Sequence, residues 1–241
     1  MKLLIIRHAD PDYSIDSLTE KGWREAAFLS ERVALLTIEK VYVSPLGRAK
    51  DTASLSLKKL NKEAETLEWL REFHAPIREE QTGNMRIPWD WVPEEWSRNE
   101  LFYDKDLWST VPIMQEGKVG EEATYVNQGL DMILNRHGYQ REGNLYHVMK
   151  PNNDTIVFFC HFGVECVMLG HLLGISPMVL WHGTCAAPSS VTTLVTEERR
   201  EGTASFRMTS FADISHLYKM EAPSFAARFC ECYQNKEERH D

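Results

Sequence analysis

The chain has 241 residues, of which 43% are hydrophobic and 26% are charged, and its formal net charge is −9 at pH 7. This length suits one large α/β domain or two small ones. The acidic balance argues against general binding to nucleic acids or to anionic membranes, because both need basic faces. A pocket of an acidic protein can still be locally positive, so a small phosphorylated ligand stays possible.

No apolar run is long enough to span a bilayer, and only four aliphatic residues separate Lys2 from Arg7, too few for a signal peptide. We therefore expect a cytoplasmic protein without a membrane partner. The five cysteines are odd in number and irregularly spaced, and Cys230 and Cys232 fall in an expected helix. This pattern predicts neither a disulfide framework nor a zinc site.

The first expected strand is the run of branched aliphatic residues 3–6, which ends at Arg7 and His8. Such a run is typical of a strand buried on both faces of a parallel sheet. Further along the chain, the spacing of apolar residues indicates several more helices and strands. The expected helices cover residues 23–36, 45–60, 164–173 and a short stretch from 223, and the expected strands cover 41–43, 155–160, 191–195 and 204–211. Strands that alternate with helices predict a mostly parallel sheet covered on both faces, a three-layer α/β sandwich.

The helix after the second strand has a clear start signal. Ser44 is a favourable N-cap and Pro45 a favourable first helical residue, which places Arg48 in the first turn. The third strand ends at His161, and Gly174 closes the helix that follows it.

Composition changes at about residues 84–118, where four tryptophans, prolines and acids gather without a sustained period: Trp89, Trp91, Trp96 and Trp108. We interpret this stretch as an insert that caps the sheet edge within a single domain spanning residues 1–241. The alternative is a surface excursion packed by its own aromatic side chains.

Basic groups follow three strand ends: Arg7 and His8, then Arg48, then His161. In a doubly wound sheet these ends can converge on one crevice. A phosphoryl group in transfer carries negative charge on its oxygens, so its catalysis needs positioning and positive charge. Two arginines can hold the oxygens bidentately, one histidine can attack phosphorus, and the other can neutralise charge.

Four segments, in this order, resemble the histidine phosphatase superfamily with its phosphoglycerate-mutase-like fold. They are LLIIRHA (3–9), LTEKG (18–22), SPLGRAKDTA (44–53) and FCHFGV (159–164). The resemblance implies that His8 attacks phosphorus and becomes a phosphohistidine, while Arg7, Arg48 and His161 hold the phosphoryl oxygens. No metal-binding motif occurs in the sequence, and two arginines with a histidine make a metal unnecessary, so we expect neither a metal nor a cofactor.

The resemblance also implies a carboxylic acid that protonates the leaving group, and the matching position is Glu72. A partly buried acid with a raised pKa can donate this proton and later accept one from water. Glu68, Glu79 and Glu80 are alternatives on the same stretch of chain.

The chain departs from the family pattern on the leaving-group side. Phe162 intervenes between His161 and Gly163, and the Trp-Glu-Gly pattern common in the family is missing. Residues that could line the substrate pocket are Ser14, Thr19, Trp89, Trp91 and His182, of which Ser14 and Thr19 are structural by default.

The expected activity is that of a histidine acid-type phosphatase acting on a small phosphorylated metabolite. One alternative is a cofactor-dependent phosphoglycerate mutase, although the sequence after His8 does not continue as in the glycolytic mutases. A second alternative is a non-catalytic phosphate-binding module. The pattern indicates neither the substrate nor the oligomeric state.

Overall fold

The structure is a computed structural model that describes residues 1–80 and 82–218. The helix expected from residue 223 and the Cys230–Cys232 pair therefore lie outside the described residues. The central element is an eight-stranded sheet. Its strands stand in the order β5 (Ala64–Thr66), β4 (Lys40–Val43), β10 (Thr155–Cys160), β1 (Lys2–Arg7), β11 (Val191–Arg200), β12 (Thr203–Asp213), β9 (Leu145–Val148) and β8 (Tyr139–Glu142).

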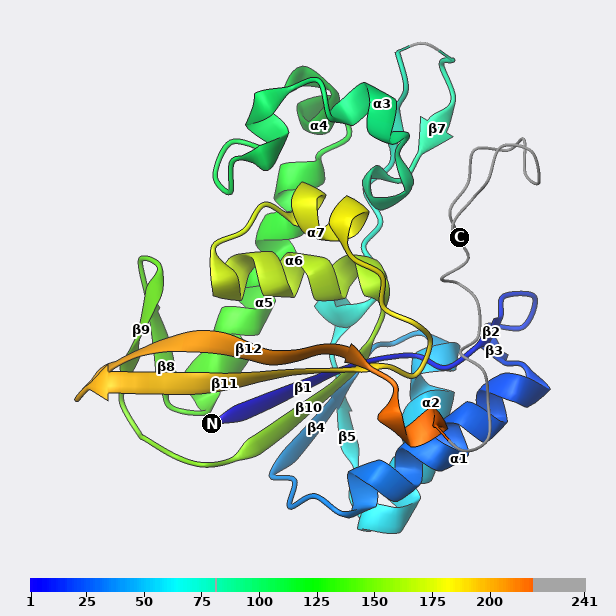
Figure 1. The fold of residues 1–241 in the computed structure, drawn as a ribbon, viewed down its shortest axis with the longest axis vertical. Coiled ribbons are helices and arrows are strands. Elements are labelled where there is room, and N and C mark those ends of the chain that lie inside the picture. Colours follow the sequence, from blue (N-terminus) through cyan, green and yellow to red (C-terminus); the bar gives the residue numbers. More distant parts are fainter. Residues whose placement is uncertain (81, 219–241) are drawn as a thin grey trace.

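The first four strands in this order pair in parallel, and from β11 onward the pairing is antiparallel. The parallel half contains the strands predicted from residues 3–6, 41–43 and 155–160. The late strand pair is a long hairpin, β11 and β12, which extends the sheet on the other side of β1 (Figure 1).

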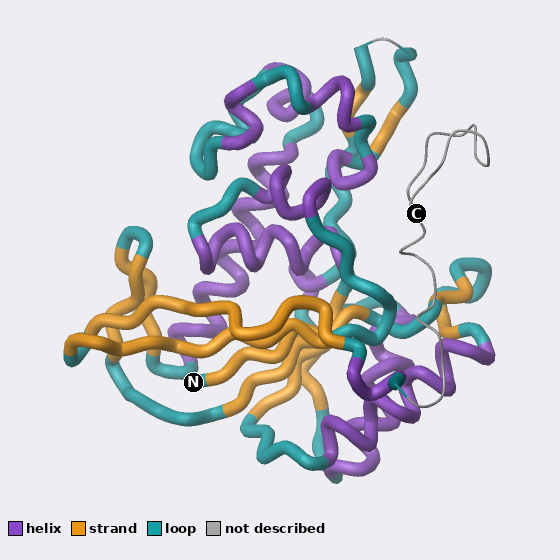
Figure 2. Tube along the Cα trace, viewed as in Figure 1, coloured by secondary structure: helices purple, strands orange, loops and turns teal. Residues whose placement is uncertain are grey.

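Helices cover both faces of the sheet, so the predicted three-layer α/β architecture is confirmed (Figure 2). Alternate residues of β1 show why. Leu3 and Ile5 belong to the larger core, together with side chains of α5 (Val119–Arg136) and α6 (Phe162–Leu173). Leu4 and Ile6 point the other way, into a second core shared with α1 (Glu20–Ala34) and α2 (Gly47–Leu60). A strand buried on both faces needs an uninterrupted apolar run.

The expected helix from Pro45 begins two residues later than its start signal indicates. α2 starts at Gly47, with Leu46 in extended conformation as its N-cap, and it ends at Leu60 as predicted. The Ser44 hydroxyl accepts a hydrogen bond from the Leu46 N–H but contacts a histidine as well. Ser44 is therefore not the N-cap of α2, and its hydroxyl lies against His161 in the site.

The stretch between β5 and α5 is built from short elements. They are η1 (Glu68–Leu70), β6 (Ile77–Arg78), β7 (Met85–Arg86), η2 (Pro88–Asp90), α3 (Pro93–Trp96), η3 (Glu100–Tyr103) and α4 (Pro112–Glu116). Trp91, Trp96 and Trp108 are buried in the larger core, and Trp108 meets Trp181 of α7 (Pro177–Gly183) edge to face. In Figure 1 this stretch stands above α6 and α7, on the side away from α1 and α2.

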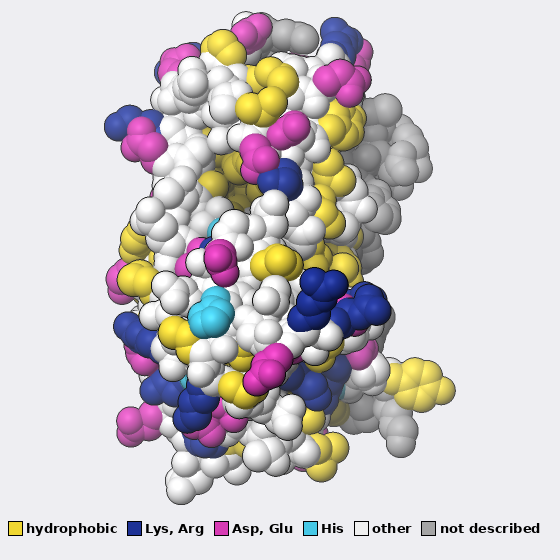
Figure 3. Space-filling view, turned by 90° about the vertical axis from the view of Figure 1, so that its left-hand side faces the viewer, with side chains coloured by type: hydrophobic (Ala, Val, Ile, Leu, Met, Phe, Trp, Pro, Cys, Tyr) yellow, Lys and Arg dark blue, Asp and Glu magenta, His cyan; other side chains and the backbone are white. Residues whose placement is uncertain are grey.

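Two small features complete the described fold. The short strands β2 (Pro11–Asp12) and β3 (Ser17–Leu18) form a hairpin directly after His8, and η4 (Ser215–Leu217) lies against α1. Within the described ranges, no helix combines the length and the hydropathy needed to cross a bilayer. Figure 3 shows the face of the molecule at which the tips of β11 and β12 lie. Acidic and basic side chains are intermingled on this face, and a hollow opens in its upper half.

Candidate active site

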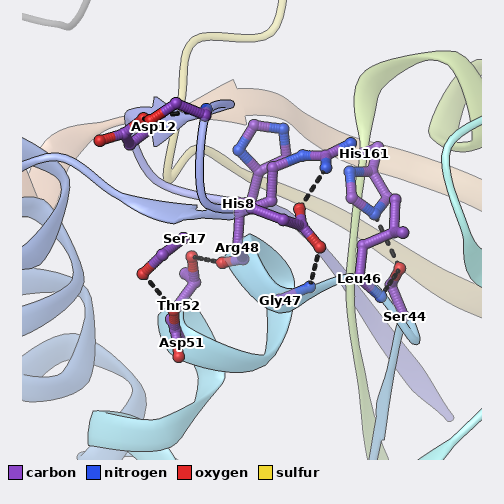
Figure 4. Close-up of polar contacts among 12 residues, drawn as sticks. His8, Asp12, Ser17, Ser44, Leu46, Gly47, Arg48, Asp51, Thr52 and His161 are labelled. Atoms are coloured by element: carbon purple, nitrogen blue, oxygen red, sulfur yellow. Dashed lines mark hydrogen bonds and ion pairs between the residues drawn. The ribbon is translucent and has the colours of Figure 1, made fainter.

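Register between two parallel strands brings the two predicted histidines together. Arg7 at the end of β1 pairs with Cys160 at the end of β10, so the next residue of each strand leaves the sheet at the same edge. Those residues are His8 and His161, whose ring centroids lie 5.0 Å apart at an interplanar angle of 56° (Figure 4). Both rings are buried, and the carboxyl ends of parallel strands are where α/β proteins place their ligand sites.

The ring of His8 is held in a defined orientation. Nδ1 lies 2.8 Å from the Ala9 carbonyl oxygen, which can only accept, so the ring proton resides on Nδ1 and Nε2 carries a lone pair. Burial, and then the charges of Arg7 and Arg48, hold the pKa of His8 well below its ordinary value. The hydrogen bond to Ala9 acts in the opposite direction without reversing this shift. His8 is therefore uncharged at neutral pH, with its lone pair on Nε2.

His161 is neutral for similar reasons. Burial lowers its pKa well below the ordinary value, and His8, Arg48 and Arg7 add to the effect. Nε2 lies 2.7 Å from the Ser44 hydroxyl. Nδ1 is buried and has no hydrogen-bond partner among residues 1–80 and 82–218. The ring thus has one nitrogen engaged with the protein and one open to a ligand.

Arg7 is fixed by the loop that precedes β11. Its Nη1 donates to the Ala186 carbonyl at 2.6 Å, and its backbone N–H donates to the Ser190 carbonyl. The same loop returns a hydrogen bond from the Ser189 N–H to the His8 carbonyl. The Arg7 guanidinium also lies over the Phe162 ring, 5.8 Å from its centroid. The loop carries no sequence motif, so sequence analysis did not find it.

Arg48 reaches the site from the first turn of α2. Its Nη1 donates to Oδ1 of Asp16 at 2.6 Å, whereas Nε is buried without a partner in the described part of the chain. Thr52, one turn further along α2, accepts a hydrogen bond from the Ala9 N–H and donates to the Arg48 carbonyl. The first turns of α2 are therefore tied directly to the chain that carries His8.

Glu72 lies in the loop after η1 and reaches the N-terminal turn of α6. Its Oε1 accepts from the Phe73 N–H at 2.7 Å and from the Val164 N–H at 3.1 Å. Burial raises the pKa of this carboxyl, although the Phe73 hydrogen bond and the charge of Arg7 partly oppose the rise. A carboxyl that keeps its proton above the usual range is suited to general acid catalysis.

The three alternative acids occupy other environments. Glu68 and Glu80 are exposed. Glu79 is buried, but it forms an ion pair with Arg86 and accepts a hydrogen bond from Thr82 in the β6–β7 hairpin. Of the four candidates, Glu72 alone has a recorded hydrogen bond to α6, the helix that begins after His161.

The proposed pocket residues do not all come together. Trp89 lies beside Glu72, because a Cβ on Gly163 would come within 2.8 Å of the indole and 2.6 Å of Glu72 Oε1. Nε2 of His182 donates to the Pro88 carbonyl oxygen at 3.0 Å, and the ring stacks on Trp96. These contacts tie α7 to the inserted stretch.

The remaining pocket candidates have contacts within their own segments. The indole N–H of Trp91 donates to Glu95, and its ring packs on Phe102. Ser14 is exposed and donates to Asp12. Thr19 caps α1 by accepting from the Gly22 N–H. For Ser14 and Thr19 these contacts match the structural role expected by default.

No group of three or more His, Cys, Asp or Glu side chains that could hold a metal ion occurs in the ranges that the structure describes. Metal-independent action remains a prediction. Sequence analysis did not assign two buried residues to the site. Ser44 contacts His161, and Glu165 has a pKa that burial raises to about 7.

Comparison with known proteins agrees with this geometry. The sequence profile described as the histidine phosphatase superfamily (branch 1) matches residues 3–107, which confirms the resemblance. No curated protein sequence matches the chain.

Two solved structures illustrate the likeness of fold. A phosphoserine phosphatase mutant from Entamoeba histolytica, crystallised with phosphoserine, has a TM-score of 0.60 and 18% identity, over 90% of this chain and 98% of that one. A mycobacterial glucosyl-3-phosphoglycerate phosphatase has a TM-score of 0.59 and 16% identity, over 88% and 98% of the two chains. At such identities the comparison shows a shared phosphoglycerate-mutase-like fold.

Proposed function

We propose that the chain, whose residues 3–107 match the histidine phosphatase superfamily profile, is a metal-independent phosphomonoesterase with His8 as nucleophile. One observation carries the proposal. A neutral His8 with a free Nε2 stands beside two buried donors without partners in the described chain, Nε of Arg48 and Nδ1 of His161. Buried polar groups are normally paired, so these two donors favour an anionic ligand next to the nucleophile.

In the first proposed step, Nε2 of His8 forms a bond to phosphorus while the bond from phosphorus to the ester oxygen breaks. Arg7, Arg48 and His161 hold the phosphoryl oxygens, whose negative charge they neutralise. The Ser44 hydroxyl lies 2.7 Å from Nε2 of His161, and in the proposed mechanism it donates to Nε2, so that the His161 proton is on Nδ1 for this task. Glu72 gives its proton to the leaving alkoxide.

In the second step, water attacks the phosphohistidine. The Glu72 carboxylate accepts a proton from the water, the bond between nitrogen and phosphorus breaks, and inorganic phosphate leaves. One acid thus acts in both directions and returns to its starting state.

We further propose a small phosphorylated metabolite as substrate and the inserted stretch of residues 84–118 as a cap on the leaving-group side. The position of Trp89 beside Glu72 supports the cap. The two proteins of similar fold, a phosphoserine phosphatase and a glucosyl-3-phosphoglycerate phosphatase, support a small substrate.

A rapid-quench experiment with a ³²P-labelled phosphomonoester tests the nucleophile. Wild type is expected to accumulate an acid-labile, alkali-stable phosphoenzyme and to hydrolyse an aryl phosphate. His8→Ala is expected to do neither. His147→Ala, a change of an exposed histidine on β9, serves as the matched control. Turnover retained by a folded His8→Ala would overturn the assignment. Isomerisation of 3-phosphoglycerate with a bisphosphoglycerate primer would instead indicate a mutase.

A further inference from the structure

We infer that the loop of residues 13–16 positions Arg48, with Asp16 as the residue that fixes its guanidinium toward the phosphoryl site. This inference rests on the proposed function, because it assigns the role of holding a reacting phosphoryl group to Arg48. Neither Asp16 nor Tyr13 belongs to the set of residues that the sequence motifs single out.

The Asp16 carboxylate binds both the side chain of Arg48 and the first backbone N–H of α2. Oδ1 of Asp16 accepts from Nη1 of Arg48 at 2.6 Å, and Oδ2 accepts from the Gly47 N–H at 2.7 Å. The Arg48 side chain is 12% exposed, while that of Asp16 is 44% exposed. The carboxylate thus approaches from the solvent side and binds one nitrogen of a largely buried guanidinium.

The open donor of Arg48 lies on a different part of the same group. Nε is buried and has no partner in the described residues, although Nη1 is engaged. Because a guanidinium is planar and presents its N–H groups in a fixed fork, fixing Nη1 also fixes the direction of Nε. The charge of Arg48 lowers the pKa of both His8 and His161, so the open donor belongs to a group close to both rings.

Tyr13 holds the guanidinium from another direction. The Arg48 carbon Cζ lies 5.4 Å from the Tyr13 ring centroid, a cation–π distance, although the tyrosine is 64% exposed. Asp16 and Tyr13 are three residues apart in one loop, which β2 and β3 flank. The loop therefore contacts Arg48 with both a carboxylate and a ring.

The backbone of the loop is shaped for this contact. Asp16 has φ of +48°, a left-handed conformation that non-glycine residues adopt at a cost. Gly47 has to be glycine at this approach, because a Cβ there would lie 2.1 Å from the Asp16 carbonyl oxygen. The loop and the start of α2 are thus in direct backbone contact, which lets a short side chain reach the guanidinium.

The test compares Asp16→Ala and Asp16→Asn in the full chain. Asp16→Ala is expected to lower kcat/KM for an aryl phosphate by roughly 100-fold, since misplacing a positioning group by about 1 Å has effects of that order. Asp16→Asn keeps one acceptor for Nη1 and is expected to recover most of this loss. Calorimetric titration with inorganic phosphate is expected to show weaker binding to Asp16→Ala in parallel. Asp106→Ala, which changes an exposed carboxylate paired with Lys105 in another segment, is the matched control and is expected to stay within threefold.

A double-mutant cycle separates positioning from a purely structural role. In an Arg48→Ala background, Asp16→Ala is expected to change kcat/KM by less than about twofold, because there is no guanidinium left to orient. An equal loss in both backgrounds would overturn the inference, as would tighter phosphate binding by Asp16→Ala, which would make Asp16 a competing anion. Phosphate binding does not require turnover, so a failure of the His8 assignment would be recognised separately.

Discussion

The Ser44 hydroxyl lies 2.7 Å from Nε2 of His161, at the point where β4 and β10 end side by side. The hydroxyl also accepts from the Leu46 N–H, so its own proton is available for Nε2. A neutral histidine carries one ring proton, and a donor at Nε2 places that proton on Nδ1. We therefore expect Ser44 to favour the His161 tautomer that carries its proton on Nδ1 and offers a donor to the ligand.

Ser44→Ala is accordingly expected to lower kcat/KM for an aryl phosphate by about tenfold, with the loss of a tautomer-fixing hydrogen bond as its cause. The imidazole ¹⁵N shifts of His161 are expected to change from one dominant tautomer to a mixture. Ser54→Ala, on the exposed side of α2, is the control. Unchanged ring shifts in Ser44→Ala would contradict this role.

Gly163 is where Glu72 and the inserted stretch meet α6. A Cβ at this position would lie 2.6 Å from Glu72 Oε1 and 2.8 Å from the Trp89 indole. Gly163→Ala is expected to displace the acid, to lower kcat by at least tenfold for an alkyl phosphate, and to cost about 1–3 kcal/mol of unfolding free energy.

Gly183→Ala is the matched control, because nothing lies within 4 Å of a Cβ built there. Steady-state kinetics and urea unfolding measure the two effects separately. Equal behaviour of the two glycine variants would show that the close approach at Gly163 is relieved without moving Glu72.

The clustering of Arg7, His8, Arg48 and His161 was predictable because its information is local in sequence. Each of them lies at or after the end of a strand whose apolar run is readable, and strand order then brings the ends together. The helix start after Ser44 was wrong by two residues: α2 begins at Gly47, and Ser44 lies before it in contact with His161. Local propensity cannot reveal such a tertiary partner.

Other parts had no readable signal. The loop that holds Arg7 does so through backbone carbonyls of Ala186 and Ser190, groups that every residue possesses. The β8–β9 hairpin consists of four-residue strands, with one buried residue in β8 and two in β9, which is too short for periodicity to identify. Asp16 meets Arg48 across 32 positions of the chain, a contact fixed by the fold of the β2–β3 hairpin.

The pH dependence of kcat/KM for an alkyl phosphate is expected to be bell-shaped. His8 must be unprotonated to attack, and its pKa is lowered, so the acid limb is expected below pH 6.5. Glu72 must be protonated to donate, and its pKa is raised above 4.5, so activity is expected to fall as pH rises through this shifted value.

Glu72→Gln is expected to remove the alkaline limb and to slow an alkyl phosphate far more than nitrophenyl phosphate, whose leaving group needs no proton. Glu68→Gln, a change of an exposed acid in η1, is the control. An alkaline limb that persists in Glu72→Gln would assign the titration to another group.

Glu165 provides a test of stability that is separate from catalysis. It is buried on α6, where burial raises its pKa to about 7 and a hydrogen bond with Thr192 and the charge of Arg7 partly counteract the rise. Because the folded state prefers the protonated acid, its contribution is fully present below about pH 4.5 and is lost as pH rises toward 7. A rise from 4.5 to about 7 corresponds to roughly 3 kcal/mol.

Glu165→Gln keeps the shape of the protonated acid and cannot ionise. Its free energy of unfolding is expected to match that of wild type near pH 4.5 and to exceed it by about 1–3 kcal/mol at pH 8. Urea unfolding at both pH values measures this difference, with Glu63→Gln, a change of an exposed acid, as the control. A difference that is the same at both pH values would mean that Glu165 is ionised in the folded protein throughout, held by Arg7 rather than kept neutral by burial.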